Sequence, residues 1–341
     1  MRGTRLWVAR IILITLAFVG LVAIEGAARV YFWFRHGVPG HSYGTSRPDP
    51  EFGAMPRENS YNSNGSLNNL GFRNSEDVFE PKPAGSLRII TYGGSSTYCH
   101  QLFNEQAWPI ALQRHLRDLG GAHAKDQVLN GGVIMWSMGH IFAKAKRDIP
   151  ALHPDIVLIY SGVNELFNAA VVAREGPSMH ELVQAHQYGH FAKGLSFNTP
   201  FRNVITYKWL RDHVVPALTA LRAPSATAPA ELTVDPDVME NYLQTTRALV
   251  EYLTANGVGV VFVREIYSPV PHLSLPVKHA FSAAGALRAT AWGARVIDPS
   301  PITEDPANRA SPLFHTTGIH FTAAGAERFA SFLFSHLFAG G

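Results

Sequence analysis

The most apolar stretch of the chain lies close to its N-terminus. Residues 11–24 are a run of 14 residues without a charge, and residues 30–34 add aliphatic and aromatic side chains. Counted through residue 34, a helix over this region is long enough to cross a bilayer of about 30 Å. Arg2, Arg5 and Arg10 precede the run, so the positive-inside rule places the N-terminus in the cytoplasm and the remaining chain outside it.

We expect residues 1–35 to form an uncleaved signal-anchor, because residues 30–34 look like an aromatic belt at a membrane interface. A cleavable signal peptide is the alternative. An apolar core of this length after basic residues fits that pattern too, and Gly26-Ala27-Ala28 offers small residues for cleavage. Both interpretations export the remaining chain. An uncleaved anchor keeps it at the membrane, in the periplasm or at the cell surface, and a cleaved signal peptide leaves it secreted.

The remaining chain alternates between short apolar runs and longer amphipathic patterns. The short runs have the length of strands, and the longer segments repeat their apolar residues at helical spacing. Strands that alternate with helices predict a parallel sheet covered on both faces. We expect strands over residues 87–92, 127–129, 155–160, 258–267 and 294–297, and helices over residues 108–119, 139–149 and 236–256 and in a last segment near the C-terminus.

The helix expected after Asp235 has the clearest boundaries. Asp235 is a favourable N-cap residue, and Pro236 suits the first helical position. Gly257 is suited to end the helix. The apolar face between these signals predicts packing against the sheet, and it comprises Val238, Tyr242, Leu249 and Leu253.

Two segments fall outside the alternating pattern. Residues 36–85 are rich in Gly, Pro, Asn and Ser, and we expect an irregular lead-in that lies on a domain formed by residues 86–341. Residues from about 166 to 235 exceed what a minimal domain needs, and we interpret them as an insertion that caps the active site. Within it, residues 223–229 resemble a Pro/Ala/Ser/Thr linker.

Polar residues at the ends of the expected strands carry candidate chemistry. The first strand leads into Gly93-Gly94-Ser95, which suits a sharp strand-to-helix turn that exposes a serine hydroxyl. The helix that follows favours developing negative charge at its N-terminus. Gly132 and Asn164 follow the next two strands, and His320 precedes the last helix. A nucleophile, a base and oxyanion donors are the groups that acyl transfer needs.

With these four residues in this order, the chain resembles the SGNH hydrolase superfamily, the GDSL-type esterases. The resemblance covers roughly residues 86–338 and implies a three-layer α/β/α sandwich around a parallel, about five-stranded sheet, the flavodoxin-like fold. It implies that Ser95 is the nucleophile and His320 the base. The oxyanion donors would be the backbone N–H groups of Ser95 and Gly132 and the side-chain amide of Asn164.

The chain also resembles membrane-anchored members of this superfamily in the segment Asn69-Leu70-Gly71-Phe72-Arg73, which lies upstream of the serine. The resemblance assigns no role to this segment.

The chain departs from the family at Thr317, where an aspartate usually stands three residues before the histidine. Threonine carries no charge to orient and stabilise an imidazolium. A backbone carbonyl could hold the ring of His320 and leave a Ser–His dyad, or Glu304 or Asp305 could approach from the preceding loop. An impaired site is the remaining alternative, and we favour the working dyad.

Composition narrows the function further. The net charge of +3 comes from residues 1–35, which hold five arginines and one acid; the remaining chain has 24 basic and 25 acidic residues. This balance argues against nucleic acid as a partner. Cys99 is the only cysteine, and we expect a buried apolar residue rather than a nucleophile. His180, His186 and His190 lack the spacing of a metal site, so we expect neither metal nor cofactor.

We therefore expect a membrane-anchored serine esterase that acts outside the cytoplasm on O-acylated carbohydrate or another cell-envelope ester, through an acyl-Ser95 intermediate. An O-acyltransferase would use the same intermediate, and a lipid ester is a weaker alternative substrate. A hypothesis of another class is a glycan-binding or assembly protein on a degenerate hydrolase fold, for which Thr317 is the main support.

Overall fold

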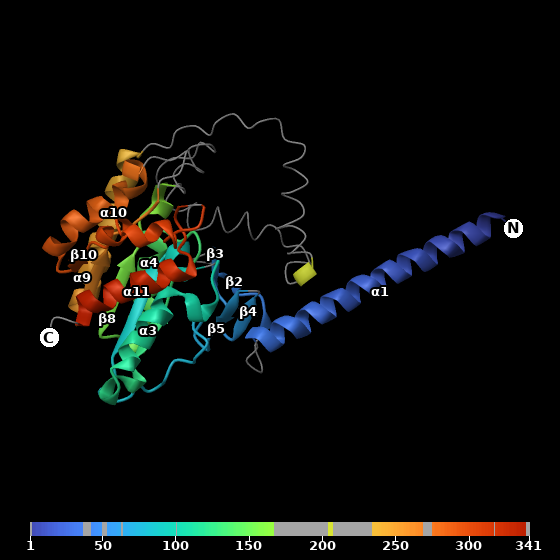
Figure 1. Cartoon of the computed structure of the whole chain (residues 1–341), viewed down its shortest axis with the longest axis horizontal. Helices are drawn as coiled ribbons and strands as arrows, with labels where there is room; N and C mark the ends of the chain where they lie inside the picture. The colour runs from blue at the N-terminus through green and yellow to red at the C-terminus, as the bar shows by residue number, and fades with distance from the viewer. Residues whose placement is uncertain are drawn as a thin grey trace.

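The fold is described from a computed structural model of the chain (Figure 1). Most of the expected insertion at residues 166–235, with its proposed cap and its linker at residues 223–229, lies outside the described residues. The structure describes residues 2–36, 42–49, 53–62, 64–99, 101–166, 204–206, 234–268, 275–316 and 318–338.

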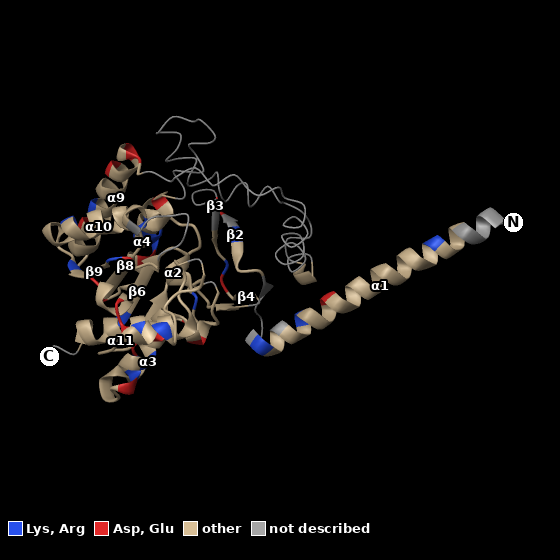
Figure 2. Cartoon of the chain, turned by 45° about the horizontal axis from the view of Figure 1, so that its top comes forward, with Lys and Arg blue, Asp and Glu red and all other residues tan. Residues whose placement is uncertain are grey.

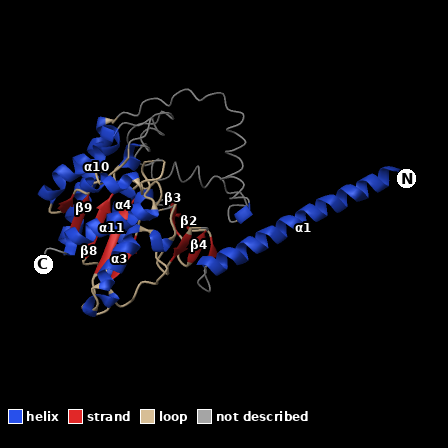
Figure 3. Ribbon diagram, in the orientation of Figure 1, coloured by secondary structure: helices blue, strands red, loops and turns tan. Residues whose placement is uncertain are grey.

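A five-stranded parallel sheet lies at the centre of the domain (Figure 3). Its strand order is β10-β9-β8-β6-β7. Ile90 of β6 pairs with Leu129 of β7 on one side and with Val157 of β8 on the other. All five strands lie where the apolar runs predicted them. They are β6 (Arg88–Gly93), β7 (Gln127–Asn130), β8 (Ile156–Tyr160), β9 (Gly259–Val263) and β10 (Arg295–Ile297).

Helices α3 (Trp108–Asp118) and α11 (Ala323–Phe338) cover one face of the sheet. Leu158 of β8 is buried in the same apolar cluster as Leu112 of α3 and Phe329 of α11. Successive residues of a strand point to opposite faces, so the neighbouring residues of β8 serve the other layer.

Three helices cover the opposite face: α4 (Met138–Leu152), α9 (Pro236–Ala255) and α10 (Leu275–Ala289). Here Val157 of β8 shares a buried cluster with Leu249 of α9. Both faces of the parallel sheet are therefore covered, and the three-layer α/β/α sandwich is confirmed.

The helix boundaries agree with the sequence signals in one case and differ in others. Asp235 caps α9, because its carboxylate accepts the backbone N–H groups of Asp237 and Val238. Helix α10 was not predicted, since its many small residues hide a helical period. The predicted strand over residues 258–267 already ends at Val263.

Short 3₁₀ helices are η1 (Asn104–Gln106), η2 (Gly121–Lys125), η4 (Thr290–Trp292), η5 (Ser300–Thr303) and η6 (Pro306–Arg309).

The lead-in contains short strands that were not predicted. They form a three-stranded sheet with the order β1-β4-β5 and a separate antiparallel pair, β2-β3. Met55 of β3 packs on the fully buried Trp136, in the loop between β7 and α4, so this pair lies against the domain. The strands are β1 (Ser42–Tyr43), β2 (Ser46–Asp49), β3 (Gly53–Pro56), β4 (Ser60–Asn62) and β5 (Gly65–Leu67).

Helix α1 (Arg2–His36) extends away from the domain as one continuous helix (Figure 1). Its segment Trp7–Arg35 is long and apolar enough to cross a membrane. Charged residues are few along the coloured part of the helix (Figure 2), and its apolar side chains from Trp7 onward are exposed in the isolated chain. A bilayer would remove these side chains from water, which fits an N-terminal membrane helix.

Candidate active site

Strand β6 carries Ser95 to the carboxyl edge of the sheet. The strand ends at Gly93, and helix α2 (Ser95–Tyr98) begins two residues later. Gly93 has no room for a side chain, because an added Cβ would lie 2.1 Å from both Thr97 Oγ1 and the carbonyl oxygen of Tyr160. The turn is therefore tight, and it leaves Ser95 8 % exposed at the first position of α2.

His320 reaches Ser95 from the segment that precedes α11. Its Nε2 lies 2.9 Å from Ser95 Oγ, at hydrogen-bond distance, although the two residues are 225 positions apart. The backbone around His320 is held by the isolated bridge between Phe314 and Phe321. It is also held by the N–H of Ser268, which donates to the Gly318 carbonyl at 2.9 Å. The structure thus brings together the predicted nucleophile and base.

Asn164 lies against the residue that precedes the nucleophile. An added Cβ at Gly94 would meet Asn164 Nδ2 at 2.2 Å. The amide is buried, and its Nδ2 donates to the Trp136 carbonyl at 2.8 Å. That bond uses one of the two N–H donors of a primary amide and fixes the plane of the group.

Gly132 lies on the other side of the nucleophile helix. An added Cβ at Gly132 would lie 2.3 Å from the backbone nitrogen of Tyr98, so only glycine allows this approach. The Gly132 N–H donates to Asn130 Oδ1 at 3.1 Å. To donate to an oxyanion, this N–H must therefore share its hydrogen bond with Asn130 Oδ1 or give that bond up. Nothing in the sequence marks this competing acceptor.

The orienting acid was left open by the sequence, and Thr317 lies outside the described residues. Of the two substitute acids, Asp305 caps η6, where its Oδ1 accepts the N–H of Ala307 at 2.8 Å. Glu304 and Asp305 both lie at the exposed surface. In this arrangement the Asp305 carboxylate serves a helix cap.

Cys99 is a buried residue at the C-cap of α2, in a left-handed conformation. Its thiol lies 3.3 Å from the Ser96 carbonyl oxygen. Burial raises the pKa of the Cys99 thiol to about 11, so the thiol stays protonated at neutral pH. This environment is that of a packed side chain, not of a thiolate nucleophile.

Arg73 binds the C-terminal end of α2, a role that the sequence did not indicate. It is 1 % exposed, and its guanidinium donates to the carbonyl oxygens of Tyr98, Cys99 (2.6 Å) and Leu102. The same group lies 4.4 Å from the ring centroid of Tyr98. Helix C-terminal carbonyls lack partners within the helix, and a fork of N–H donors can satisfy several of them. Arg73 therefore fixes the C-terminal end of the nucleophile helix.

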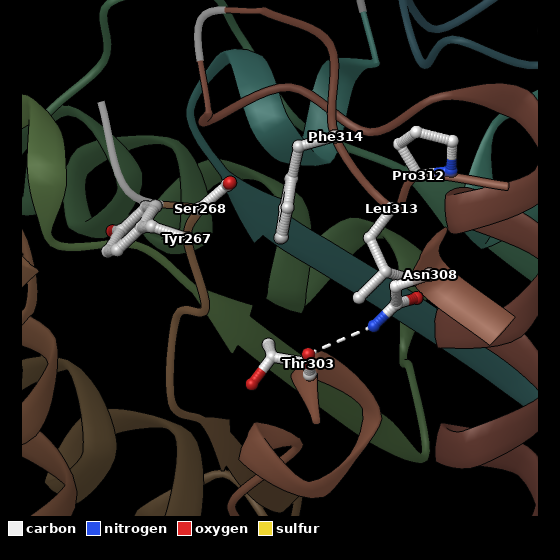
Figure 4. A pocket seen from close by; sticks show the side chains of 7 residues that line it. All are labelled: Tyr267, Ser268, Thr303, Asn308, Pro312, Leu313 and Phe314. Atoms are coloured by element: carbon white, nitrogen blue, oxygen red, sulfur yellow. Dashed lines mark hydrogen bonds between the residues drawn. The ribbon is translucent and has the colours of Figure 1, made fainter. Parts of the chain in front are cut away.

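A cavity of about 340 Å³ lies beside the His320 segment (Figure 4). Two of its lining residues belong to contacts that hold this segment: Ser268, bonded to Gly318, and Phe314, bridged to Phe321. In Figure 4, Tyr267 and Ser268 line one side and Leu313 lies across from them. The lining combines aromatic rings with hydroxyl and amide groups, and it comprises Tyr267, Ser268, Thr303, Asn308, Pro312, Leu313 and Phe314.

Among the described residues, no group of three or more His, Cys, Asp or Glu side chains could hold a metal ion. His180, His186 and His190 lie outside these residues.

No family model and no curated protein matches this sequence. Solved structures that are similar to the chain include a lipolytic protein of the G-D-S-L family from Desulfitobacterium hafniense DCB-2, with 14 % identity, a TM-score of 0.45, and coverage of 74 % of this chain and 100 % of that one. The acetyl xylan esterase AlAXEase has 12 % identity and a TM-score of 0.47, with coverage of 74 % and 100 %. A lipase/acylhydrolase from Enterococcus faecalis has 12 % identity and a TM-score of 0.46, with coverage of 74 % and 95 %. The function has to be argued from the residues of this chain.

Proposed function

We propose that this chain is a serine-dependent ester hydrolase of the SGNH type, with Ser95 as nucleophile and His320 as general base. The observation that carries the proposal is the distance of 2.9 Å between Ser95 Oγ and His320 Nε2. A nucleophile within hydrogen-bond reach of a base is the arrangement that activates a serine hydroxyl. The serine stands at the carboxyl edge of a parallel sheet, where α/β folds place their ligands.

The reaction proceeds in two halves. Ser95 Oγ attacks the ester carbonyl carbon while His320 Nε2 takes the hydroxyl proton. The tetrahedral intermediate collapses to acyl-Ser95, and the leaving alkoxide takes the proton back from His320. Water then attacks the acyl carbon with His320 again as base. The bond between the acyl carbon and Ser95 Oγ breaks, Ser95 takes the proton from His320, and a carboxylic acid leaves.

The negative charge of the intermediate would be bound beside Gly94. Asn164 can offer its second amide N–H there, because the first one holds the Trp136 carbonyl. Gly132 would contribute its backbone N–H on exchange of its bond to Asn130. Ser95 would contribute its own backbone N–H at the start of α2. The loss of one such donor typically costs about 10²–10³ in turnover.

A Ser–His dyad is the proposed form of the site, with Thr317 in place of an acid. A carboxylate at position 317 would stabilise the imidazolium by its charge, which threonine does not do. Thr317→Asp should raise kcat if the position can supply the acid. A variant that gains nothing while wild type turns over would show that the dyad is held by other groups.

We propose that α1 is retained after export and anchors the domain at the outer face of a membrane. One set of contacts supports retention. Glu25 of α1 accepts the backbone N–H groups of Ile205 (3.0 Å) and Thr206 (2.9 Å). Cleavage after Ala28 would remove Glu25 and leave two backbone donors without their carboxylate. A tag at the N-terminus should therefore remain with the membrane-bound protein.

The proposed substrate is an O-acyl group on an exported or envelope carbohydrate. Its support is the extracytoplasmic placement together with the cavity beside the His320 segment, whose aromatic, hydroxyl and amide groups suit a sugar. Transfer of the acyl group to a sugar hydroxyl is the alternative outcome of the same intermediate. Product analysis with and without an acceptor sugar distinguishes hydrolysis from transfer.

The deciding experiment uses the full chain in detergent with a fluorophosphonate probe and an aryl acetate. We expect wild type to be labelled and to release acetate, and Ser95→Ala and His320→Ala to lose both. Wild type that is folded yet silent in both assays would overturn the hydrolase proposal. Glycan binding that persists in Ser95→Ala would then favour a binding protein, the alternative that the missing acid suggests.

A further inference from the structure

Two glutamates are buried next to Asn164, and neither takes part in the proposed chemistry. Glu165 follows Asn164 in the turn after β8, and Glu265 lies in the segment after β9. They are 8 % and 2 % exposed, respectively. Burial of a carboxyl group costs free energy unless its oxygens accept hydrogen bonds. The donors bonded to these two carboxyl groups therefore indicate what the glutamates hold in place.

Glu265 binds the turn that carries Asn164. Its Oε2 accepts the backbone N–H of Val163 at 2.8 Å, one residue before Asn164. The hydroxyl of Tyr267 donates to the same oxygen. The backbone N–H of Glu265 donates to Ser282 Oγ of α10 at 2.6 Å, which fixes the glutamate itself.

The turn is shaped to accept this carboxylate. An added Cβ at Gly162 would lie 3.1 Å from Glu265 Oε2 and 2.8 Å from the backbone nitrogen of Ser282. A side chain at this position would push the turn away from Glu265. Gly162 therefore allows Val163 to approach the carboxylate.

Glu165 holds the same turn from the opposite side. Its Oε1 accepts the backbone N–H of Met138, the first residue of α4, at 2.6 Å. Asn164 Nδ2 donates to Trp136, two residues earlier in the same loop. The Asn164 turn is thus held between the loop before α4 and the segment after β9, with one glutamate on each side.

The groups that surround the two carboxyls are mostly neutral. Burial raises the pKa of both glutamates to about 7, and the charge of Glu265 adds to the rise at Glu165. The ring of His279 of α10 is tilted against that of Tyr267, with ring centroids 4.9 Å apart, and burial lowers the pKa of His279. Lys278 Nζ donates to the Ser268 carbonyl. The titratable and charged groups facing this layer are Tyr160, Glu165, Tyr242, Glu265, Tyr267, Lys278 and His279.

We propose that Glu265 is a positioning residue for the oxyanion site: through the Val163 N–H it holds the Asn164 amide in the orientation that receives the substrate oxygen. The proposal rests on the proposed hydrolase function. Glu265 touches no reacting atom, so its effect on turnover has to pass through Asn164. Ionisation of both glutamates would place two negative charges beside a developing oxyanion, which should lower kcat above about pH 7.

The test is a double-mutant cycle on the full chain in detergent, with aryl acetate hydrolysis as the readout. Glu265→Ala should lower kcat about 10-fold or more, up to the about 10²–10³ expected for the loss of the donor itself, with little change in KM. In the Asn164→Ala background the same substitution should lower kcat less than threefold, because the donor it positions is gone. Equal losses in both backgrounds would overturn the proposal and leave the hydrolase function intact.

Glu265→Gln is the second variant, and it keeps an oxygen for the Val163 N–H without a charge. It should retain kcat at neutral pH within about threefold and show a smaller decline above about pH 7, because only Glu165 can still ionise. Retention of the wild-type decline would contradict the role of the carboxyl pair. Asp148→Asn is the matched control, since Asp148 also accepts from a buried tyrosine, Tyr92 (2.7 Å), but binds Lys144 as its other partner.

A readout without activity keeps the two proposals separable. Hydrogen exchange of the peptide over residues 161–166 should become faster in Glu265→Ala and stay near wild type in Glu265→Gln and Asp148→Asn. Unchanged exchange in Glu265→Ala would overturn the positioning role. Wild type without probe labelling would instead defeat the hydrolase proposal, whatever the exchange result.

Discussion

Ser96 Oγ donates a hydrogen bond to the carbonyl oxygen of Ile319 at 3.2 Å. This bond joins the residue after the nucleophile to the residue before the base. The two ends of the catalytic pair are thereby linked by a contact of their own, separate from the bond between Ser95 and His320. The geometry of the pair depends on neighbours that take no part in the chemistry.

Ser96→Ala should lower kcat about fivefold and leave KM nearly unchanged. A neutral hydrogen bond contributes about 1 kcal/mol, and its loss lets the Ile319–His320 segment shift away from Ser95. The rate of fluorophosphonate labelling measures the effect directly. Ser335→Ala is the matched control, because Ser335 Oγ donates to the Phe332 carbonyl at the exposed end of α11. Equal labelling rates for Ser96→Ala and wild type would refute the linkage.

Gly94→Ala should lower kcat by about 10² while the fold is retained. The added methyl would meet Asn164 Nδ2 at 2.2 Å, so the amide must move from its place beside the nucleophile. Steady-state kinetics and circular dichroism together measure this outcome. Gly85→Asn is a suitable control, since an added Cβ there meets nothing within 4 Å and asparagine tolerates the φ of +75°. A fully active Gly94→Ala would exclude Asn164 as an oxyanion donor in this position.

Arg73→Lys should destabilise the protein by about 2–4 kcal/mol and slow the labelling of Ser95. A lysine offers one ammonium where the guanidinium binds the carbonyl groups of Tyr98 and Cys99 at the end of α2 and of Leu102 beyond it, so buried acceptors lose their partner. Denaturant unfolding monitored by fluorescence gives the free energy. Arg247→Lys, on the exposed face of α9 beside Glu251, should change it by less than about 0.5 kcal/mol. Similar losses of unfolding free energy in Arg73→Lys and Arg247→Lys would show that the buried contacts of Arg73 stabilise the protein no more than a surface ion pair does.

Stability should fall as the pH rises from about 4.5 to about 7. Glu165 and Glu265 have an ordinary pKa of 4.5 and a pKa of about 7 in the folded chain, mainly because burial disfavours their charge. In this window the folded chain binds more protons than the unfolded chain. The stability that this proton binding provides is therefore lost as the pH rises through the folded pKa. Thermal melting of wild type and Glu265→Gln measures the difference.

The melting temperature of Glu265→Gln should fall less over this pH range than that of wild type. Glu251→Gln, at an exposed site, should follow wild type. Parallel curves for wild type and Glu265→Gln would show that Glu265 does not titrate in this window.

Local signals in the sequence were sufficient for the sheet and for most of its helices. Each strand of the central sheet is a short apolar run, because a parallel strand is buried on both faces. Asp235, Pro236 and Gly257 marked the limits of α9, because capping is decided within one turn. By contrast, α10 and the short strands of the lead-in were missed, since their stability comes from packing and pairing with distant residues.

The sequence by itself determined which residues carry the candidate chemistry and the order in which they follow the strands. Only the tertiary structure decided the distances between them, such as that between Ser95 and His320, because the closing of the sheet and its helices brings residues 225 positions apart to 2.9 Å. The segment that contains Arg73 stood out in the sequence without an assigned role, and Glu265 gave no recognisable signal. Their partners are backbone groups, which are the same in every residue, and only the fold determines which of them meet.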